Sequence, residues 1–289
     1  MFCLCRAEPS RGGIVETEYP FINSLQNPKI KLVVKLRDRR DRDSLGLFPI
    51  EGYRELLRAC DGMREMETLF ICPELFLGSN EPALIQRIAE KGVPVLRCSE
   101  PVFRKMSYRD RPDGLIAIAP HYSSSLQDLE KILAEKPIPF LVVAEAIEKP
   151  GNLGTILRSS DAVALDALIV CDRCTDIHNP NVVRASVGTL FTVPVIEAES
   201  KETIAFLKKK GIKILAATPH AEAEYTDIDM TLPLAIAVGT EQLGLSRLWM
   251  DEADICVRIP MCGTADSLNV AMATTLLMYE ALRQRGKKR

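Results

Sequence analysis

Apolar runs alternate with helical segments along the second half of the chain, and this alternation predicts its fold. From residue 139 onward, the apolar runs read FLVVAEA, ALIVC, TVPVI, KILAAT, LAIAV and ICVRI. Helical segments such as TILRSSDAVA, NVVRASVGTLF and KETIAFLKKKG separate them. Runs that are apolar throughout are typical of strands buried on both faces, so we predict an α/β fold with a parallel sheet and helices on both faces. Ligands of such sheets bind beyond the carboxyl ends of the strands.

The first half of the chain has a less regular pattern, which predicts a separate and smaller α/β domain. Between residues 21 and 120, short runs such as TLFI and VPVL alternate with helical patterns such as 81–91. The stretch HYSSSLQDLEKILAEKPIP then combines a Ser cluster, one amphipathic helical stretch and two prolines, which is typical of a linker. The predicted organisation is an unstructured leader (1–20), a small domain (21–120), a linker (121–138) and a larger domain (139–289).

The charge of the chain excludes a generally basic nucleic-acid binder but permits a local basic patch. The 289 residues carry a formal net charge of -2. Between Lys29 and Arg58, however, nine basic residues stand against five acidic ones. Within this patch Arg37, Arg39 and Arg40 are candidates for RNA binding. A solvated helix face with i,i+4 ion pairs explains the same run equally well.

The apolar runs and the cysteines indicate where the protein works. No apolar stretch approaches the roughly 20 residues needed to span a bilayer, so we expect no membrane partner and a cytoplasmic location. The nine cysteines are odd in number, which favours reduced thiols over disulfides. Cys171 and Cys174 form a C-x-x-C motif with His178 nearby. This motif permits a redox or zinc site, but no second cysteine pair accompanies it, so we expect no metal.

Three polar loops follow three of the predicted strands. The loop KPGNLGTILRSSDA contains Asn152 near a helix start and Arg158 about two turns further on. The loop GTEQLGLS contains Glu241, and PMCGTADSLN contains Ser267 and Asn269. Neither the G-x-G-x-x-G fingerprint nor the G-x-x-x-x-G-K-[ST] loop of nucleotide-binding proteins is present. An ordinary capped turn explains any one loop, but three at the same edge of a sheet indicate a ligand site.

Together, the segments NLGTILRSSDA, VGTEQLGLS and IPMCGTADSLNVAMATTLLMYEALRQR resemble the three signature motifs of the SpoU (TrmH-like) RNA ribose 2'-O-methyltransferases of the SPOUT superfamily. The resemblance covers residues 140–289. Residues 21–120, with SLQNPKIKLVVKLRDRRDRDSLGLFPIEGYRELL, resemble the L30e-like domain that binds structured RNA in one subgroup.

This resemblance implies a C-terminal trefoil knot that binds S-adenosylmethionine and a homodimer formed through the knot region. It also implies methyl transfer to a ribose 2'-hydroxyl, with ribosomal RNA favoured as substrate. Transfer RNA stays open as substrate. Two other functions also stay open: a catalytically idle RNA-binding protein of ribosome assembly, and a small-molecule methyltransferase.

The resemblance further implies roles for individual residues. Arg158 would lie at the ribose, as an electrostatic stabiliser or as a base; we favour the former because the pKa of arginine stays above about 12. Asn152 would orient Arg158 or a loop backbone, and Glu241 would contact Arg158 or a backbone amide. Ser267 and Asn269 complete the catalytic set, although helix capping explains both nearly as well. The expected cofactor-binding residues are Gly239, Thr240, Gly244, Ile259, Met261, Leu268 and Asn269.

One further segment and three departures complete the comparison with the family pattern. The stretch NPNVVRAS resembles the segment that lines the RNA side of the site, which makes Arg184 another candidate for RNA binding. The chain has Ala164 where glycine is usual, Thr240 where asparagine is common and Ala271 where serine is frequent. None of these departures removes a group that is assigned to the chemistry.

Overall fold

The computed structural model describes residues 19–286, and the first part of the chain forms a five-stranded mixed sheet. Its elements are β1 (Phe21–Ile22), α1 (Pro28–Lys35), α2 (Arg39–Leu45), β2 (Leu47–Glu51), α3 (Tyr53–Asp61), β3 (Thr68–Ile71), η1 (Pro73–Leu75), α4 (Glu81–Ala89), β4 (Val95–Cys98), α5 (Glu100–Met106) and β5 (Leu115–Pro120). The strand order is β1-β4-β3-β5-β2, with β1, β4 and β3 parallel and β5 antiparallel to both of its neighbours. All but the last two residues of the predicted leader lie outside the described residues.

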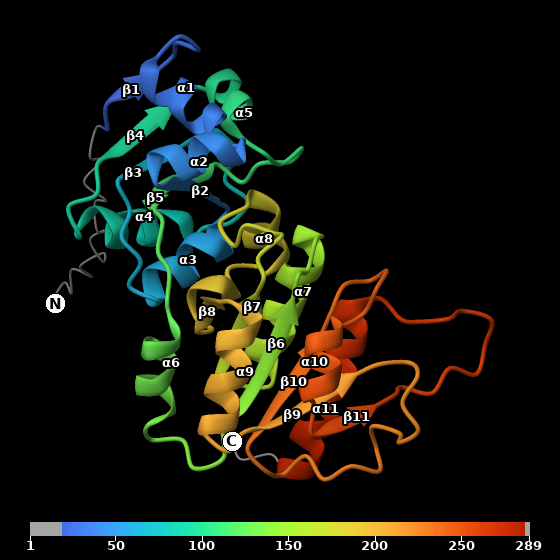
Figure 1. Ribbon diagram of the computed structural model, residues 1–289. Coiled ribbons are helices and arrows are strands. Elements are labelled where there is room, and N and C mark those ends of the chain that lie inside the picture. The colour runs from blue at the N-terminus through green and yellow to red at the C-terminus, as the bar shows by residue number, and fades with distance from the viewer. Residues whose placement is uncertain (1–18, 287–289) are drawn as a thin grey trace, which may run out of the picture.

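The second part of the chain forms a six-stranded sheet that is parallel throughout, as predicted (Figure 1). Its elements are α6 (Leu126–Leu133), β6 (Phe140–Glu145), α7 (Pro150–Ala162), β7 (Ala167–Cys171), α8 (Pro180–Ala185), η2 (Thr189–Phe191), β8 (Val195–Ala198), α9 (Ser200–Lys209), β9 (Lys213–Ala217), β10 (Leu234–Val238), α10 (Arg247–Glu252), β11 (Ile255–Val257) and α11 (Val270–Arg285). The strand order is β11-β9-β10-β6-β7-β8. The carboxyl ends of all six strands therefore lie along one edge of this sheet.

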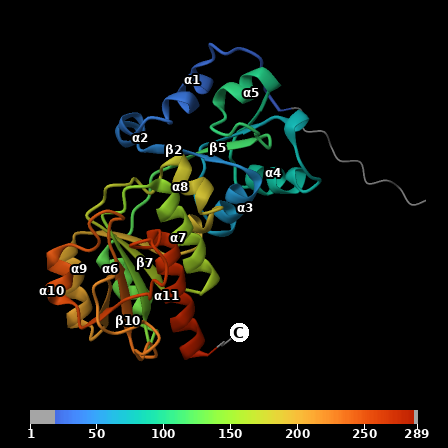
Figure 2. The same cartoon turned by 90° about the vertical axis from the view of Figure 1, so that its right-hand side faces the viewer.

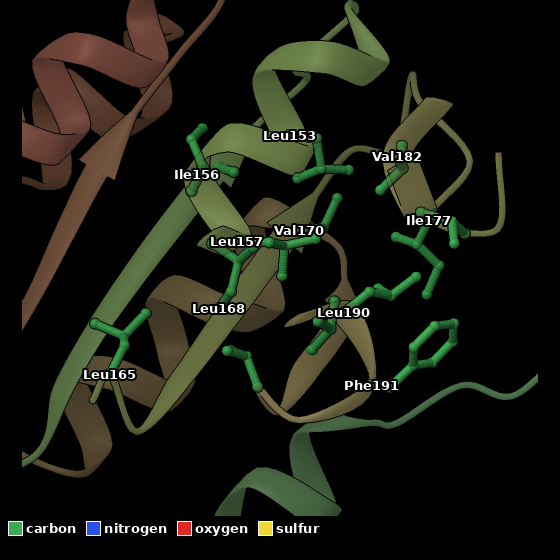
Figure 3. Close-up of a cluster of buried hydrophobic side chains, with 14 of the residues drawn as sticks. Leu153, Ile156, Leu157, Leu165, Leu168, Val170, Ile177, Val182, Leu190 and Phe191 are labelled. Carbon is green, nitrogen blue, oxygen red and sulfur yellow. The ribbon is translucent and has the colours of Figure 1, made fainter. Parts of the chain in front are cut away.

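Helices cover both faces of the parallel sheet, which confirms the prediction. Val142 of β6 belongs to a buried cluster with Leu277 of α11 and the leucines of α7. Its neighbour Leu141 belongs to a second cluster, together with Leu207 of α9 and Trp249 of α10. Successive residues of a strand point to opposite faces, so these two clusters are the two sides of the sheet. Figure 3 shows how the α7 side chains pack over β7 on the first of these sides.

The helix predicted over 181–191 is wrong in its extent. It ends at Ala185, and the chain then turns through Val187 and Gly188, whose φ angles are 54° and 83°. A Cβ atom at Gly188 would lie 2.8 Å from Cα of Glu55 in α3, so the close approach of a distant segment requires glycine there. The strand that follows, predicted as TVPVI, begins only at its fourth residue.

The two sheets are joined by a common core and a buried ion pair. One hydrophobic cluster contains both Phe48 of β2 and Phe191 of η2. Nη2 of Arg42 lies 2.8 Å from Oδ2 of Asp176, and both side chains are almost completely buried. Arg42 also donates to two carbonyl oxygens of the α1–α2 connection. Its charge and its hydrogen-bonding capacity are thus used within the protein.

The amphipathic stretch predicted within 121–138 forms α6, whose Leu129 is fully buried in the second cluster of the parallel sheet. The domain boundaries and the trefoil knot stay predictions. Across residues 19–286, no helix combines the length and apolar character that a membrane crossing requires.

Candidate active site

The three polar loops meet at the carboxyl edge of the parallel sheet, where their side chains form one hydrogen-bonded network. Nδ2 of Asn152, in the first turn of α7, donates to Oε1 of Glu241. Nδ2 of Asn269 donates to the same Glu241 oxygen at 2.8 Å and to Oδ1 of Asn152 at 3.1 Å. Oδ1 of Asn269 also accepts from the N–H of Ala271 at 3.0 Å and caps α11. Asn269 therefore caps α11 and also links the other two loops, while its catalytic role stays a prediction.

The cation of this network is Lys149, and Glu241 contacts neither Arg158 nor a backbone amide among the described residues, which were its two predicted partners. Nζ of Lys149 pairs with Oε2 of Glu241. The hydrogen bonds from Lys149 and Asn152 lower the pKa of Glu241 below its ordinary value of 4.5, so it is a carboxylate at neutral pH. Arg158 follows Asn152 by six residues, which places it about 9 Å further along the helix and on another face. Asn152 accordingly orients Glu241 and not Arg158.

A tight turn follows β10 and is held to β6. The backbone N–H of Thr240 donates to the carbonyl of Gly244 and the N–H of Gly244 to that of Thr240, both at 3.0 Å. A Cβ atom at Gly239 would lie 2.1 Å from the carbonyl oxygen of Gly244, so the turn can close only with glycine at that position. The N–H of Ser246 donates to Oε2 of the buried Glu145 at 2.8 Å. These contacts fix the turn relative to the end of β6.

The loop between β11 and α11 leaves its backbone polar groups unused. From Ile259 to Leu268, no backbone hydrogen bond reaches any other residue that the structure describes. Residues 262–267 are exposed, while Ile259, Met261 and Leu268 are half-buried. The Ser267 hydroxyl also has no hydrogen-bond partner within the described chain. Backbone donors and acceptors of this loop are therefore available to a ligand that lies against its half-buried apolar side chains.

Arg158 lies on the exposed face of α7, and its guanidinium makes no hydrogen bond or ion pair within residues 19–286. The neighbouring Ser159 connects α7 to α11, because its hydroxyl lies 2.7 Å from that of Thr275. Figure 2 shows the two helices side by side on this face of the protein. Arg158 is thus available to bind an external anion.

The candidates for RNA binding have different environments. Arg37 donates to three carbonyl oxygens at the end of α5, which stabilises that helix terminus. Arg39 donates to the carbonyl oxygen of Cys174 at 3.1 Å. Arg40 and Arg184 are exposed and have no ion-pair partner among the described residues. Two of the four arginines therefore have structural contacts that need no RNA.

The C-x-x-C motif has the properties of a structural segment. Cys171 is buried and lies 3.3 Å from the hydroxyl of Thr203. Burial raises the pKa of its thiol to about 12, which disfavours the reactive thiolate. The ring of His178 stacks on that of His121 at 4.2 Å. Within the described residues no group of three or more His, Cys, Asp and Glu side chains has the arrangement of a metal site, and every cysteine is free.

Two residues of the site were missed from the sequence. Glu145 carried a signal, because a lone acid inside an apolar strand needs a buried partner. Lys149 carried none, since a lysine before a helix is ordinary surface composition and its partner lies 92 residues away.

Two family models match separate parts of the chain. The model of the SpoU rRNA Methylase family matches residues 139–279. The model of the MRM3-like substrate binding domain matches residues 27–117.

Full-length relatives show the same similarity. A 23S rRNA (guanosine(2553)-2'-O)-methyltransferase, RlmP of Bacillus subtilis (strain 168), is 27% identical over 258 residues, which are 89% of this chain and 97% of the relative. The crystal structure of an RNA 2'-O ribose methyltransferase is 39% identical, with a TM-score of 0.79, and the match covers 92% of this chain and 99% of that one. An AdoMet-bound rRNA methyltransferase from Sinorhizobium meliloti is 29% identical with a TM-score of 0.82, and the match covers 92% and 98%.

Proposed function

The chain belongs to the SpoU rRNA methylase family, and from this premise we propose that it transfers the methyl group of S-adenosylmethionine to a ribose 2'-hydroxyl of ribosomal RNA. The observation that carries the proposal is the network of Asn152, Glu241 and Asn269, since each residue comes from a different motif. The functions that the relatives' names give support it, because they include 2'-O-methylation of RNA and, in two cases, action on rRNA.

The residues at the carboxyl edge of the sheet fit S-adenosylmethionine. An adenine edge needs backbone donors and acceptors, and the unused backbone groups of 259–268 supply both. The half-buried side chains of Ile259, Met261 and Leu268 offer an apolar surface beside them. We assign cofactor binding to this loop and to the turn from Gly239 to Gly244. When bound, S-adenosylmethionine supplies an electrophilic methyl group on a sulfonium.

The side chains around this loop align the substrate and stabilise the charge that develops during the reaction. The pairing of Glu241 with Lys149 and with two asparagines holds the three loops in register. Their alignment fixes the direction from which a 2'-hydroxyl approaches. Arg158, with a guanidinium that no described residue engages, binds the neighbouring phosphate and stabilises the negative charge that develops on the 2'-oxygen. Ser267 is placed to contact the same substrate from the exposed side of the loop.

We also propose that the protein is a homodimer that pairs through the knot region. On α11, Met272, Leu276 and Tyr279 are 62%, 41% and 49% exposed, and their spacing places them in one stripe. Leu243, in the turn after β10, is 88% exposed. An exposed apolar stripe such as that of α11 is typical of an interface with another protein. A second copy of the chain would cover them and would adjoin the exposed face of α7 that carries Arg158.

In this proposal, residues 21–120 bind the RNA substrate and residues 139–289 perform the reaction. The first assignment rests on the match of 27–117 to a substrate-binding domain. The free thiols fit a reducing compartment, so we place the reaction in the cytoplasm.

The test is to incubate the protein with labelled S-adenosylmethionine and ribosomal RNA from cells that lack the modification. Alkaline hydrolysis of the product should leave one labelled, alkali-resistant linkage, because a methylated 2'-hydroxyl cannot attack its phosphate. Transfer RNA treated in the same way should stay unlabelled. Label in transfer RNA alone would contradict the ribosomal assignment, and cofactor binding without any label would contradict methyl transfer to RNA.

A further inference from the structure

A cavity of about 750 Å³ lies between the mixed sheet and the parallel sheet, away from the three motif loops. Its walls come from the start of α3, the start of α4, the loop 109–113 and α8. We call it the α3–α8 cavity. Its volume falls within the roughly 300–1,000 Å³ that ligand pockets usually have. Figure 1 shows α8 beside α7 and below the elements of the mixed sheet.

The exposed part of this cavity is cationic. Arg54, Arg111 and Arg184 line it, all three are exposed, and none of their guanidinium groups forms a hydrogen bond or ion pair with a described residue. One exposed acid, Asp110, accompanies them. Unpaired guanidinium groups around a concave site suit phosphate groups, which they bind with paired hydrogen bonds.

The buried and half-buried residues that line the cavity are held by ion pairs and hydrogen bonds. Arg109 is fixed there by Glu55, at 2.5 Å, and by Asp113, at 3.6 Å. Nη2 of Arg109 also donates to the carbonyl oxygen of Glu51 at 2.8 Å, next to Gly52, whose φ angle of 113° favours glycine. The buried Glu81 also lines the wall, and its Oε1 accepts from two backbone N–H groups.

Three polar atoms of these lining residues have no hydrogen-bond partner within the described chain: Oε2 of Glu81, Nε of Arg109 and Oδ1 of Asp113. Buried polar atoms usually have partners, and each exception calls for a physical reason. These three atoms are buried, so the groups that a ligand in the cavity can reach are the exposed ones. The lining also contains one aromatic residue, Tyr53, on which a base can stack.

We propose that the α3–α8 cavity binds one unstacked nucleotide of the RNA substrate, with its base against Tyr53 and its flanking phosphates on Arg54, Arg111 and Arg184. The inference rests on the proposed function, because it takes RNA as the substrate. The charge pattern supports it, because three exposed guanidinium groups that no described residue engages line the cavity.

A helix that lines the cavity packs directly against a helix of the proposed methyl-transfer site. A Cβ atom at Gly154 of α7 would lie 2.5 Å from Cβ of Ala185 in α8, so these two helices touch with almost no space between them. Arg184 of the cavity therefore sits on a helix packed directly against the one that carries Asn152 and Arg158. A nucleotide held in the cavity would fix the distance along the RNA from the recognised base to the methylated ribose.

The experiment measures the Kd for the ribosomal RNA fragment that the wild type methylates or, if it methylates none, binds most tightly. The fragment is prepared with single abasic positions along its unpaired segments. For the wild type, one abasic position should raise the Kd about tenfold, which is the usual loss for one stacked base. For Tyr53→Ala the same abasic position should change the Kd by less than about twofold, because the contact is already gone. Tyr53→Phe should keep the sensitivity of the wild type.

A second set of variants tests the phosphates. Arg54→Ala combined with Arg111→Ala should raise the RNA Kd about tenfold and reduce the slope of log Kd against log salt by about two, one for each lost contact. The Kd for S-adenosylmethionine should not change. The matched control is Arg104→Ala, which removes an exposed arginine from α5 in the same part of the chain and should leave the RNA Kd unchanged.

The outcomes separate this inference from the proposed function. RNA that is methylated with no effect of Tyr53→Ala or of the arginine pair overturns the cavity and keeps methyl transfer. RNA that is bound through the cavity but never methylated keeps the cavity and overturns the proposed function. Failure to bind RNA at all overturns both.

Discussion

At the scale of single residues, Arg158 differs from the rest of the site because no described residue engages its charge. If it stabilises charge on the phosphate and the 2'-oxygen, Arg158→Ala should lower kcat about 100-fold or more, as the loss of one preorganised donor usually does. The Kd for S-adenosylmethionine should change less than about twofold. Calorimetric titration and a methyl-transfer assay measure the two effects separately. Arg158→Lys keeps the charge without the planar fork and should give an intermediate rate. An equal loss of rate and cofactor affinity in Arg158→Ala would assign the residue to cofactor binding instead.

The residues of this network also show which contacts could be predicted from the sequence and which could not. Asn152, Glu241 and Asn269 each follow a strand of one parallel sheet, so their meeting could be predicted from strand order and motif position. The partner of Glu241 could not, because it depends on which turn of α7 faces the loop. Arg158 was the obvious cation from its motif, but six residues of helix carry it away from Asn152. Lys149, which directly precedes α7, is the cation that pairs with Glu241 instead.

At the scale of elements, the contact between α7 and α8 depends on Gly154. Alanine at this position would place a methyl group 2.8 Å from the backbone nitrogen of Ser186, so the helices must separate. We expect Gly154→Ala to lower the free energy of unfolding by about 1–3 kcal/mol, despite the better helix propensity of alanine. Gly151→Ala is the matched control, because the same helix has open space around that residue. Urea denaturation measures both, and equal effects would contradict the steric argument.

The exposed stripe of α11 gives a second prediction at this scale. Leu276→Arg places a charge in the middle of the proposed dimer interface and should convert the protein to monomers in sedimentation experiments. Leu45→Arg is the control, since Leu45 is about as exposed, at 47% against 41%, but lies on α2. If both variants keep the assembly state of the wild type, the stripe is not the interface.

The elements themselves were predictable to different degrees. The strands β6, β7 and β10 of the parallel sheet are buried on both faces, which leaves an apolar run in the sequence. The end of α8 leaves no comparable signal, because it is set by the approach of α3 to Gly188 from over 120 residues away in the chain. Local periodicity cannot report a contact of that kind. The helix predicted over 181–191 was therefore too long.

At the scale of the whole molecule, polar groups are buried where the two sheets meet. Arg42 and Asp176 form an ion pair there, and the N–H of His178 donates to Oδ1 of Asp176 at 2.8 Å. Burial alone would raise the pKa of Asp176, but the hydrogen bonds from Arg42 and from the backbone of His178 bring it below 3.8. Asp176 thus remains charged at neutral pH. The ring centroid of His178 lies 4.5 Å from that of Phe48 and 4.2 Å from that of His121.

This environment makes the stability of the junction depend on pH. Burial, together with the nearby His121, lowers the pKa of His178 from 6.5 to about 3. Between pH 6.5 and about pH 3, the imidazole of His178 is protonated in the unfolded chain but neutral in the folded protein. The free energy of unfolding therefore falls as the pH falls from 6.5. Each pH unit corresponds to at most about 1.4 kcal/mol, so the wild type should lose up to about 2 kcal/mol between pH 6.5 and pH 5 through this residue. His178→Phe keeps an aromatic ring of similar size and cannot be protonated. Its free energy of unfolding from urea denaturation should therefore fall less over that range, whatever its value at pH 7. If the free energy of unfolding fell equally with pH in the two proteins, His178 would have the same pKa in the folded and unfolded states. The ring of His178 would then contribute nothing to the acid sensitivity of the junction.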